Sequence, residues 1–193
     1  MVSILAYSGT MSDAATTSIP AGTWAVDTSH STIGFVARHM MVAKVRGRFK
    51  DFTADIVIAE NPLESRVDAT VQMASVDTND ETRDNHLRTN DFFDIENHPT
   101  MTFRTTSIEP DGDNYKLNGD LTVRGVTKPV TFDLEVGGVG KDPWGNTKAG
   151  FSATTTINRK DFGVEWNAPL ETGGVIVGDK VTIELDIEAA LQQ

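Results

Sequence analysis

From Trp24 onward, hydrophobic and polar residues alternate in short runs that are separated by turn sequences. Alternation with a period of two puts every second side chain on one face, which is typical of a β-strand with one buried side. Turn signals such as "PDGDN" at 110 and "KDPWGN" at 141 indicate that neighbouring strands are antiparallel. The predicted strands are "HSTIGFVARH", "FTADIVIA", "SRVDATVQMAS", "TMTFRTTS", "NYKLNGDLTVRG", "VTFDLEV", "KAGFSATTTINR" and "KVTIELDIEA".

About eight strands with regular turns predict an all-β fold, either an antiparallel barrel or a sandwich. Small residues such as Ala54 and Ala69 share the inward faces with large ones such as Phe35, Phe103 and Phe151. This mixture is compatible with a filled barrel or with a narrow cavity for one ligand. Because protein interiors are close-packed by default, the residues alone favour a filled core.

One segment, residues 80–94, breaks the strand period. Asp80 occupies the N-cap position before "ETRDNHLR", which predicts a short helix, and Asp84 and Arg88 have the spacing of a favourable ion pair. Leu87 is expected to face the body of the protein. The following "NDFFD" predicts a turn that tucks its two phenylalanines inward. The sequence therefore predicts a helical insertion and an apolar plug at one end of the barrel.

The charge pattern argues against polyanionic partners. The chain carries 28 acidic and 17 basic residues, a formal charge of −11. The densest basic run, "KVRGRFK" from Lys44 to Lys50, alternates and so forms one solvated strand face. Nucleic acid and anionic membrane surfaces are therefore not expected partners.

The sequence offers no motif for catalysis. The chain has no cysteine, which excludes disulfides, thiolate metal sites and cysteine nucleophiles. The histidines His30 and His39 are nine residues apart, and His86 and His98 are twelve apart, unlike the pairs that usually bind zinc. No nucleophile elbow and no glycine-rich phosphate loop is present.

The first residues predict little structure. The apolar run "VSILAY" is far shorter than the ~20 residues of a membrane span, and no basic region marks it as a signal peptide. We expect residues 1–20 to form a disordered or upstream arm and residues 21–193 a single domain. Translation from either Met1 or Met11 fits this division. The expected location is the cytoplasm, with a periplasmic or secreted protein as the alternative.

Five blocks, in order, carry a resemblance to a known family. They are "WAVDTSHSTIGFVARHM", "VRGRFKDFTADI", "SVDTNDETRDNHLRTNDFFDIENHPTMTF", "LNGDLTVRGVTKPVTFDLEV" and "GFSATTTINRKDFGV". Together they resemble the YceI-like family of lipocalin-like barrels, which bind polyisoprenoids and related lipids. The resemblance implies a barrel with an apolar tunnel for an isoprenoid or another long apolar lipid, such as a quinone-like molecule.

The family resemblance also implies which residues meet the ligand. The predicted lining consists of Phe35, Phe49, Met73, Leu87, Phe92, Phe103, Leu121 and Phe151, with His39 as the polar contact. Arg83, Asp84 and His86 are expected to hold the helical cap by hydrogen bonds. The protein is then a carrier and not an enzyme, with no cofactor beyond the bound lipid.

Two other functions stay open at this stage. One is a metal-dependent or other enzyme built around His39, Asp84 and His86. The other is an acidic module that binds a partner protein. Formation of a homodimer through the barrel strands is compatible with every one of these functions.

Overall fold

The fold is taken from a computed structural model that describes residues 18–193, so the expected arm at 1–20 lies outside the described residues except for its last three. The strands are β1 (Gly22–Val26), β2 (Thr32–His39), β3 (Ala43–Phe49), β4 (Phe52–Ile58), β5 (Arg66–Gln72), β6 (Val76–Asp77), β7 (Thr100–Asp111), β8 (Asn114–Val123), β9 (Val126–Lys141), β10 (Thr147–Asn158) and β11 (Val177–Leu191). The helix α1 spans Glu81–Arg88, and short 3-10 helices span Pro62–Glu64, Met73–Ser75 and Arg159–Phe162.

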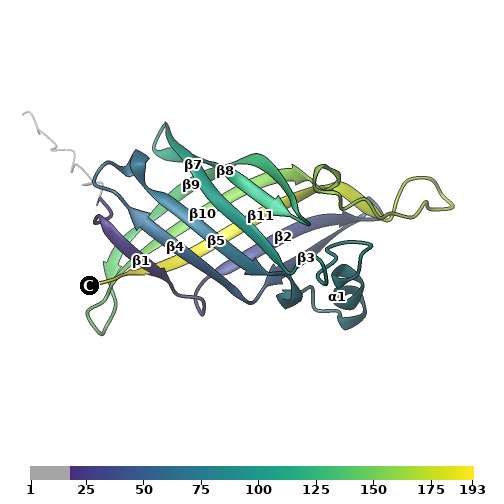
Figure 1. Ribbon diagram of the computed structural model, residues 1–193, viewed down its shortest axis with the longest axis horizontal. Helices are drawn as coiled ribbons and strands as arrows, with labels where there is room; N and C mark the ends of the chain where they lie inside the picture. Colours follow the sequence, from purple (N-terminus) through teal and green to yellow (C-terminus); the bar gives the residue numbers. More distant parts are fainter. Residues whose placement is uncertain (1–17) are drawn as a thin grey trace, which may run out of the picture.

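The strands form one antiparallel sheet that closes on itself (Figure 1). Its order is β1-β4-β5-β7-β8-β9-β10-β11, and β1 pairs back onto β11. The strands β2, β3 and β6 continue β1, β4 and β5 along the same wall, so the barrel has eight strands, three of them broken by a bend. The prediction of an all-β barrel of about eight strands is confirmed.

Serine hydroxyls satisfy the backbone where the strands bend. Between β1 and β2, the Ser31 hydroxyl accepts a hydrogen bond from Glu188 N (3.0 Å) and donates one to Glu188 O (3.2 Å). Between β3 and β4, the Ser75 hydroxyl accepts from Lys50 N (3.1 Å) and Asp51 N (3.0 Å). These side chains replace strand partners for backbone groups at the two bends.

The inward faces agree with the alternating pattern of the sequence. Three clusters of buried side chains follow one another along the barrel, around Phe132, Phe49 and Trp24. The alternating pattern did not predict β1, and the strands that it predicted for β9 and β11 are shorter than those observed. Both of those long strands continue past the predicted runs as hairpin arms.

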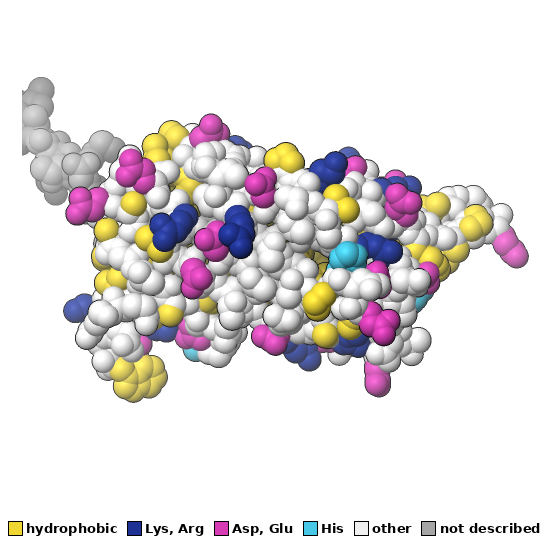
Figure 2. Space-filling model, in the orientation of Figure 1, with side chains coloured by type: hydrophobic (Ala, Val, Ile, Leu, Met, Phe, Trp, Pro, Cys, Tyr) yellow, Lys and Arg dark blue, Asp and Glu magenta, His cyan; other side chains and the backbone are white. Residues whose placement is uncertain are grey.

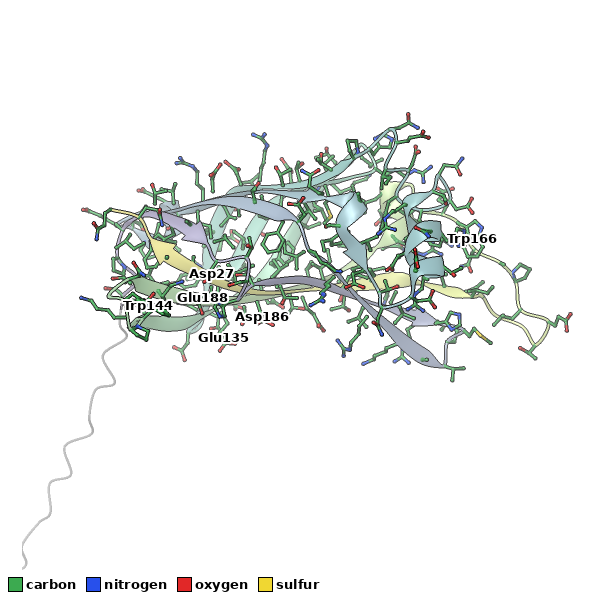
Figure 3. All side chains as sticks on the ribbon, turned by 90° about the horizontal axis from the view of Figure 1, so that it is seen from below. Asp27, Glu135, Trp144, Trp166, Asp186 and Glu188 are labelled. Atoms are coloured by element: carbon green, nitrogen blue, oxygen red, sulfur yellow. The ribbon has the colours of Figure 1, made fainter. Side chains whose placement is uncertain are left out.

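The two ends of the barrel differ. At one end lies α1, which begins after Asp80 as predicted, because the Asp80 carboxylate accepts a hydrogen bond from Arg83 N at 2.9 Å. Trp166 lies at this end and Trp144 at the opposite end (Figure 3). Within residues 18–193, no helix combines the length and the apolar character that crossing a membrane requires.

Candidate functional site

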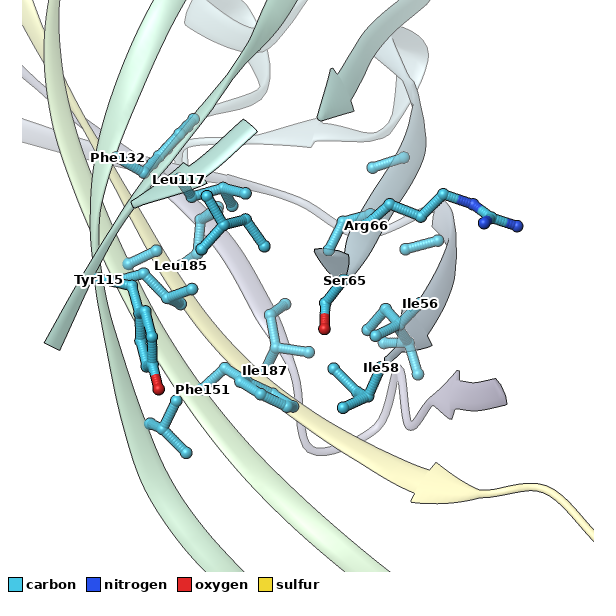
Figure 4. Close-up of a pocket in the computed structure, with 18 of the residues that line it drawn as sticks. Ile56, Ile58, Ser65, Arg66, Tyr115, Leu117, Phe132, Phe151, Leu185 and Ile187 are labelled. Carbon is cyan, nitrogen blue, oxygen red and sulfur yellow. The ribbon is translucent and has the colours of Figure 1, made fainter. Parts of the chain in front are cut away.

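A cavity of about 980 Å³ occupies the part of the barrel that lies away from α1. Its walls come from the inward faces of β1, β4, β5, β7, β8, β9, β10 and β11, with Ile33 of β2 (Figure 4). The volume lies at the upper end of the range for small-molecule sites, which is roughly 300–1,000 Å³. The large apolar side chains along the wall include Ile33, Phe52, Ile56, Ile58, Val67, Val71, Met101, Phe103, Leu117, Leu121, Phe132, Leu134, Phe151, Leu185 and Ile187.

Small residues on neighbouring strands create this space. Ala54 on β4 lies directly opposite Ala69 on β5, and Ala69 lies opposite Phe103 on β7. Two methyl groups side by side cannot reach the far wall, so the cavity stays open beside the Phe103 ring. The expectation of a filled barrel, drawn from composition alone, is therefore wrong for this half of the molecule.

The cavity opens at the end of the barrel opposite α1. Residues 18–21, the end of β4 and the turn between β7 and β8 form the rim. The charged residues of the lining, Glu60, Arg66 and Asp113, are exposed, and the Arg66 guanidinium points away from the cavity in Figure 4. The polar groups nearer the interior are hydroxyls, such as those of Ser65 and Tyr115. A guest would meet mainly apolar walls inside, while the charged residues of the described lining lie at the mouth.

A packed plug forms the floor of the cavity. The Phe49 ring lies 5.6 Å from the Phe35 ring and 6.0 Å from the Phe93 ring, measured between centroids. Buried Met73 and half-buried Leu87 of α1 belong to the same cluster. The predicted apolar plug is thus present at the α1 end of the barrel. Because the plug fills that end, the cavity opens at the other end.

Hydrogen bonds to Thr78 fix the helical insertion. Buried Asp84 accepts from Thr78 N (2.8 Å) and from the Thr78 hydroxyl (2.6 Å), while Arg83 donates to the Thr78 hydroxyl and to its carbonyl, both at 2.7 Å. The predicted ion pair between Asp84 and Arg88 is wrong, because Thr78 occupies the carboxylate. Arg88 donates instead to the carbonyl groups of Ala74 (3.0 Å) and Val76 (3.1 Å).

The histidines do not assemble a catalytic centre with Asp84. His86 Nε2 lies 2.7 Å from Asp91 Oδ2, and its ring packs edge-on against Phe92 and Trp166. His39 is exposed at the end of β2. Across residues 18–193, the one group of three histidine or acidic residues close enough to share a metal is Asp27, His30 and Glu188. The metal or enzyme alternative around His39, Asp84 and His86 is therefore not favoured.

A lysine already bridges the two carboxylates of that group. Lys148 Nζ lies 3.0 Å from Asp27 Oδ2 and 3.2 Å from Glu188 Oε1 (Figure 3 shows the two acids together on the wall). Hydrogen bonds from Ser29, His30 and Lys148 hold the pKa of Asp27 well below its usual range. His30 and Lys148 each form a hydrogen bond to Asp27, and this bond raises the pKa of each of the two side chains. This network joins the bend after β1 to β10 and β11.

The structure separates the predicted lining residues into two groups. Phe103, Leu121 and Phe151 line the cavity. The other six do not: Phe35, Phe49, Met73 and Leu87 belong to the plug, Phe92 packs against Trp166 beyond it, and His39 is exposed. The alternating pattern also placed Ile56, Val67 and Ile187 on inward faces, which was the signal for lining residues that the sequence analysis did not select.

Comparisons with known proteins agree with the barrel. Residues 24–189 match the model of the YceI-like domain. A UPF0312 protein of Staphylococcus epidermidis is 42% identical over 167 residues, which cover 86% of this chain and 95% of that protein. A UPF0312 protein of Photorhabdus laumondii is 45% identical over 134 residues, 69% of this chain and 70% of that one.

Solved structures share the architecture. The Campylobacter jejuni YCEI protein superposes with a TM-score of 0.68 at 35% identity, covering 81% of this chain and 90% of its own. Burkholderia cenocepacia BcnA gives a TM-score of 0.74 at 27% identity, with 84% and 98% covered. A polyisoprenoid binding domain from Saccharophagus degradans gives 0.68 at 15% identity, with 88% and 98% covered, a likeness of fold alone.

Proposed function

The chain belongs to the YceI-like family, and we propose that it binds one long apolar lipid, such as an isoprenoid, inside its barrel. The observation that carries the proposal is the cavity of about 980 Å³, which has apolar walls, a plugged floor and charged residues only at its mouth. A domain of the same fold is described as polyisoprenoid-binding, which supports the same class of guest.

The chemistry of the walls fits a guest that makes few polar contacts. Burying apolar surface contributes about 25 cal/mol per Å², so several isoprene units give useful affinity without a charged contact. The hydroxyls of Ser65 and Tyr115 suit a small neutral head group, such as that of a quinone-like lipid or an alcohol. We expect the tail to lie against Phe103 and Phe151 and the head group to lie near the mouth.

Binding, and not catalysis, is the activity that these residues support. Within the described chain, the lining brings together no nucleophile with a base and no group of metal ligands. The protein then acts as a carrier or store, and its cycle consists of loading and release.

The first test identifies what the protein carries. Protein purified without detergent is examined by native mass spectrometry, and its organic extract is analysed for lipids. We expect a discrete mass increment that extracts as an isoprenoid or a related lipid. A bare mass that stays unchanged after incubation with polyprenyl alcohols would contradict the proposal.

A pair of variants on one strand then locates the site. Ala69→Phe puts a ring into the cavity beside Phe103, whereas Thr70→Phe puts the same ring on the opposite face of β5. We expect Ala69→Phe to lose bound lipid while the matched Thr70→Phe retains it. Equal retention by two folded variants would place the lipid elsewhere.

A further inference from the structure

The turn between β2 and β3 exposes three consecutive apolar side chains. Met40, Met41 and Val42 are 42%, 62% and 82% exposed. The turn is closed by a hydrogen bond from Val42 N to His39 O at 3.1 Å, and it projects at the plugged end of the barrel. Single exposed apolar residues are common on protein surfaces, but three in a row at the tip of a hairpin call for a partner.

The backbone of this turn is strained by the residues it contains. Met40 and Met41 both have φ in the left-handed region, at 52° and 60°. A two-residue hairpin turn of this kind favours Asn-Gly, because a side chain with a Cβ is disfavoured at positive φ. The stability of the turn therefore does not explain why Met40 and Met41 occupy these two positions.

The strands that lead into the turn carry a row of bases. Arg38 and Lys44 lie directly opposite each other on the outer face, and Arg46 and Arg48 continue the row along β3. Residues 28–50 contain no acidic residue at all. Along the wall seen in Figure 2, by contrast, acidic and basic side chains are interspersed.

Arg38 and Lys44, the bases nearest the tip, form no ion pair with any residue of the described chain. Arg46 pairs with Glu184 at 3.2 Å, and Arg48 with Asp77 at 3.4 Å. Among the ion pairs of residues 18–193, none includes Arg38 or Lys44. Like charges directly across a strand pair are destabilising, so this pair weakens the isolated hairpin.

We propose that the β2–β3 hairpin docks the protein on an anionic lipid bilayer, with Met40, Met41 and Val42 in the interface and Arg38 and Lys44 on the head groups. An apolar tip flanked by bases is the combination that binds such a surface. The methionine and valine side chains offer no hydrogen bonds, which disfavours nucleic acid as the partner. Anionic head groups would supply Arg38 and Lys44 with the opposite charge, since these two bases form no ion pair within the described chain.

The net charge of −11 suggested that anionic surfaces are poor partners, and the fold changes that expectation. Electrostatic attraction acts within about a Debye length, roughly 8–10 Å, so the charge nearest the surface decides the contact. On β11, which pairs with β2, Glu184 already pairs with Arg46 and Asp179 with Arg159 and Lys160. Acids such as Asp133 on β9 lie on other parts of the wall. The loop before β11, residues 163–176, contributes two acids, Glu165 and Glu171.

This docking does not rest on the proposed lipid cargo, because none of these residues lines the cavity. The hairpin lies at the plugged end, so docking holds the barrel at the bilayer with its mouth turned away from the surface. The full chain is mixed with vesicles of phosphatidylcholine alone, or of phosphatidylcholine with phosphatidylglycerol, and sedimented at low and at high salt. We expect binding only to the anionic vesicles and its loss at high salt.

Matched variants assign the contact. Arg38→Gln with Lys44→Gln should weaken binding roughly thirtyfold, since each base near a charged bilayer contributes about a factor of five. Arg104→Gln with Lys141→Gln makes the same change in net charge with two exposed bases elsewhere, and should leave binding unchanged. Met41→Ser with Val42→Ser should also lose binding, while Trp144→Ser, at the mouth end, should retain it.

Several results would overturn the proposal. Equal loss in both pairs of charge variants would show that net charge alone matters. Loss in Trp144→Ser with retention in Met41→Ser and Val42→Ser would put the contact at the mouth. Wild-type protein that stays in the supernatant with anionic vesicles at low salt would exclude docking. Circular dichroism of each variant confirms that the barrel is folded, and every substituted side chain is exposed.

Discussion

The ring of Phe103 lies against the backbone of Gly119 on the neighbouring strand, so closely that a Cβ at position 119 would fall 2.3 Å from Phe103 Cζ. It would also fall 2.5 Å from Arg104 O, which cannot rotate away. We therefore expect Gly119→Ala to destabilise the protein by about 1–3 kcal/mol, as overpacking does in other cores. Urea unfolding followed by tryptophan fluorescence measures the change.

Gly140 offers the control for that substitution. It lies in β9, and a Cβ there would have no heavy atom within 4 Å. Gly140→Ala should be neutral or slightly stabilising, because alanine restricts the unfolded chain. If the two alanine variants unfold at the same urea concentration, the close contact of Phe103 with Gly119 does not exist in solution.

Arg159 is expected to be the main support of the long loop before β11. It is only 5% exposed, and burial lowers the pKa of its guanidinium while the nearby Asp179 carboxylate opposes that effect. It donates to the backbone carbonyls of Val164 (2.7 Å), Trp166 (2.9 Å), Gly178 (2.9 Å) and Val177 (3.4 Å). Arg159→Met removes this donor from all four carbonyls, of which that of Val177 keeps a second donor, Asn167 Nδ2 at 2.7 Å. We expect a loss on the order of 3 kcal/mol.

The adjacent Lys160 provides the comparison for Arg159. Its side chain is exposed and forms an ion pair with Asp179 at 3.1 Å. Surface pairs of this kind contribute about 0–1 kcal/mol, so Lys160→Met should change the melting temperature little. Thermal unfolding measures the melting temperature of both variants. Comparable decreases in melting temperature would contradict the role assigned to Arg159.

The contact of His30 with Asp27 should make stability depend on pH. Because the pKa of His30 is raised in the folded state, its contribution is full below the unfolded value of 6.5 and is lost as the pH rises through the folded value. His30→Ala should therefore lower the melting temperature more at about pH 5.5 than at about pH 8.5. His39→Ala, which removes an exposed histidine without an acidic partner in the described chain, should lower it equally at both.

Replacing the strained turn should separate stability from docking. Met40→Asn with Met41→Gly gives the residues that the backbone prefers, and we expect a gain of about 1 kcal/mol or more. The same change removes two apolar side chains from the tip, so binding to anionic vesicles should fall. A lower melting temperature for this variant would mean that the methionines are not held in the left-handed region.

The strand faces could be predicted because the side-chain period of a strand is a local property. Ile56, Leu117 and Leu185 all lie inward as their alternation indicates. The N-cap at Asp80 was equally local, since its carboxylate bonds a backbone group three residues away. Asp84 shows the limit, because its partner Thr78 is set by the path of the chain before the helix and not by helical spacing.

The position of a residue along the barrel could not be predicted in the same way. Alternation indicates that Phe49 and Phe103 both point inward, but it does not indicate which end each occupies. That depends on strand register and on the bends, which put Phe49 in the plug and Phe103 in the cavity wall. The open space depends likewise on the pairing of Ala54 with Ala69, two residues from different strands.

The seam where β11 meets β1 and β2 has a consequence for how the chain folds. The other neighbouring strands around the barrel are close in sequence and are joined by a turn, by the loop before β11, by the β2–β3 hairpin or by the segment that contains α1. By contrast, Trp24 of β1 pairs with Leu191 of β11, at the other end of the sequence. Contacts of such sequence separation form slowly, because a long loop must be closed before they can form. On the ribosome, the edges of β1 and β2 that pair with β11 would stay open until the last strand emerged.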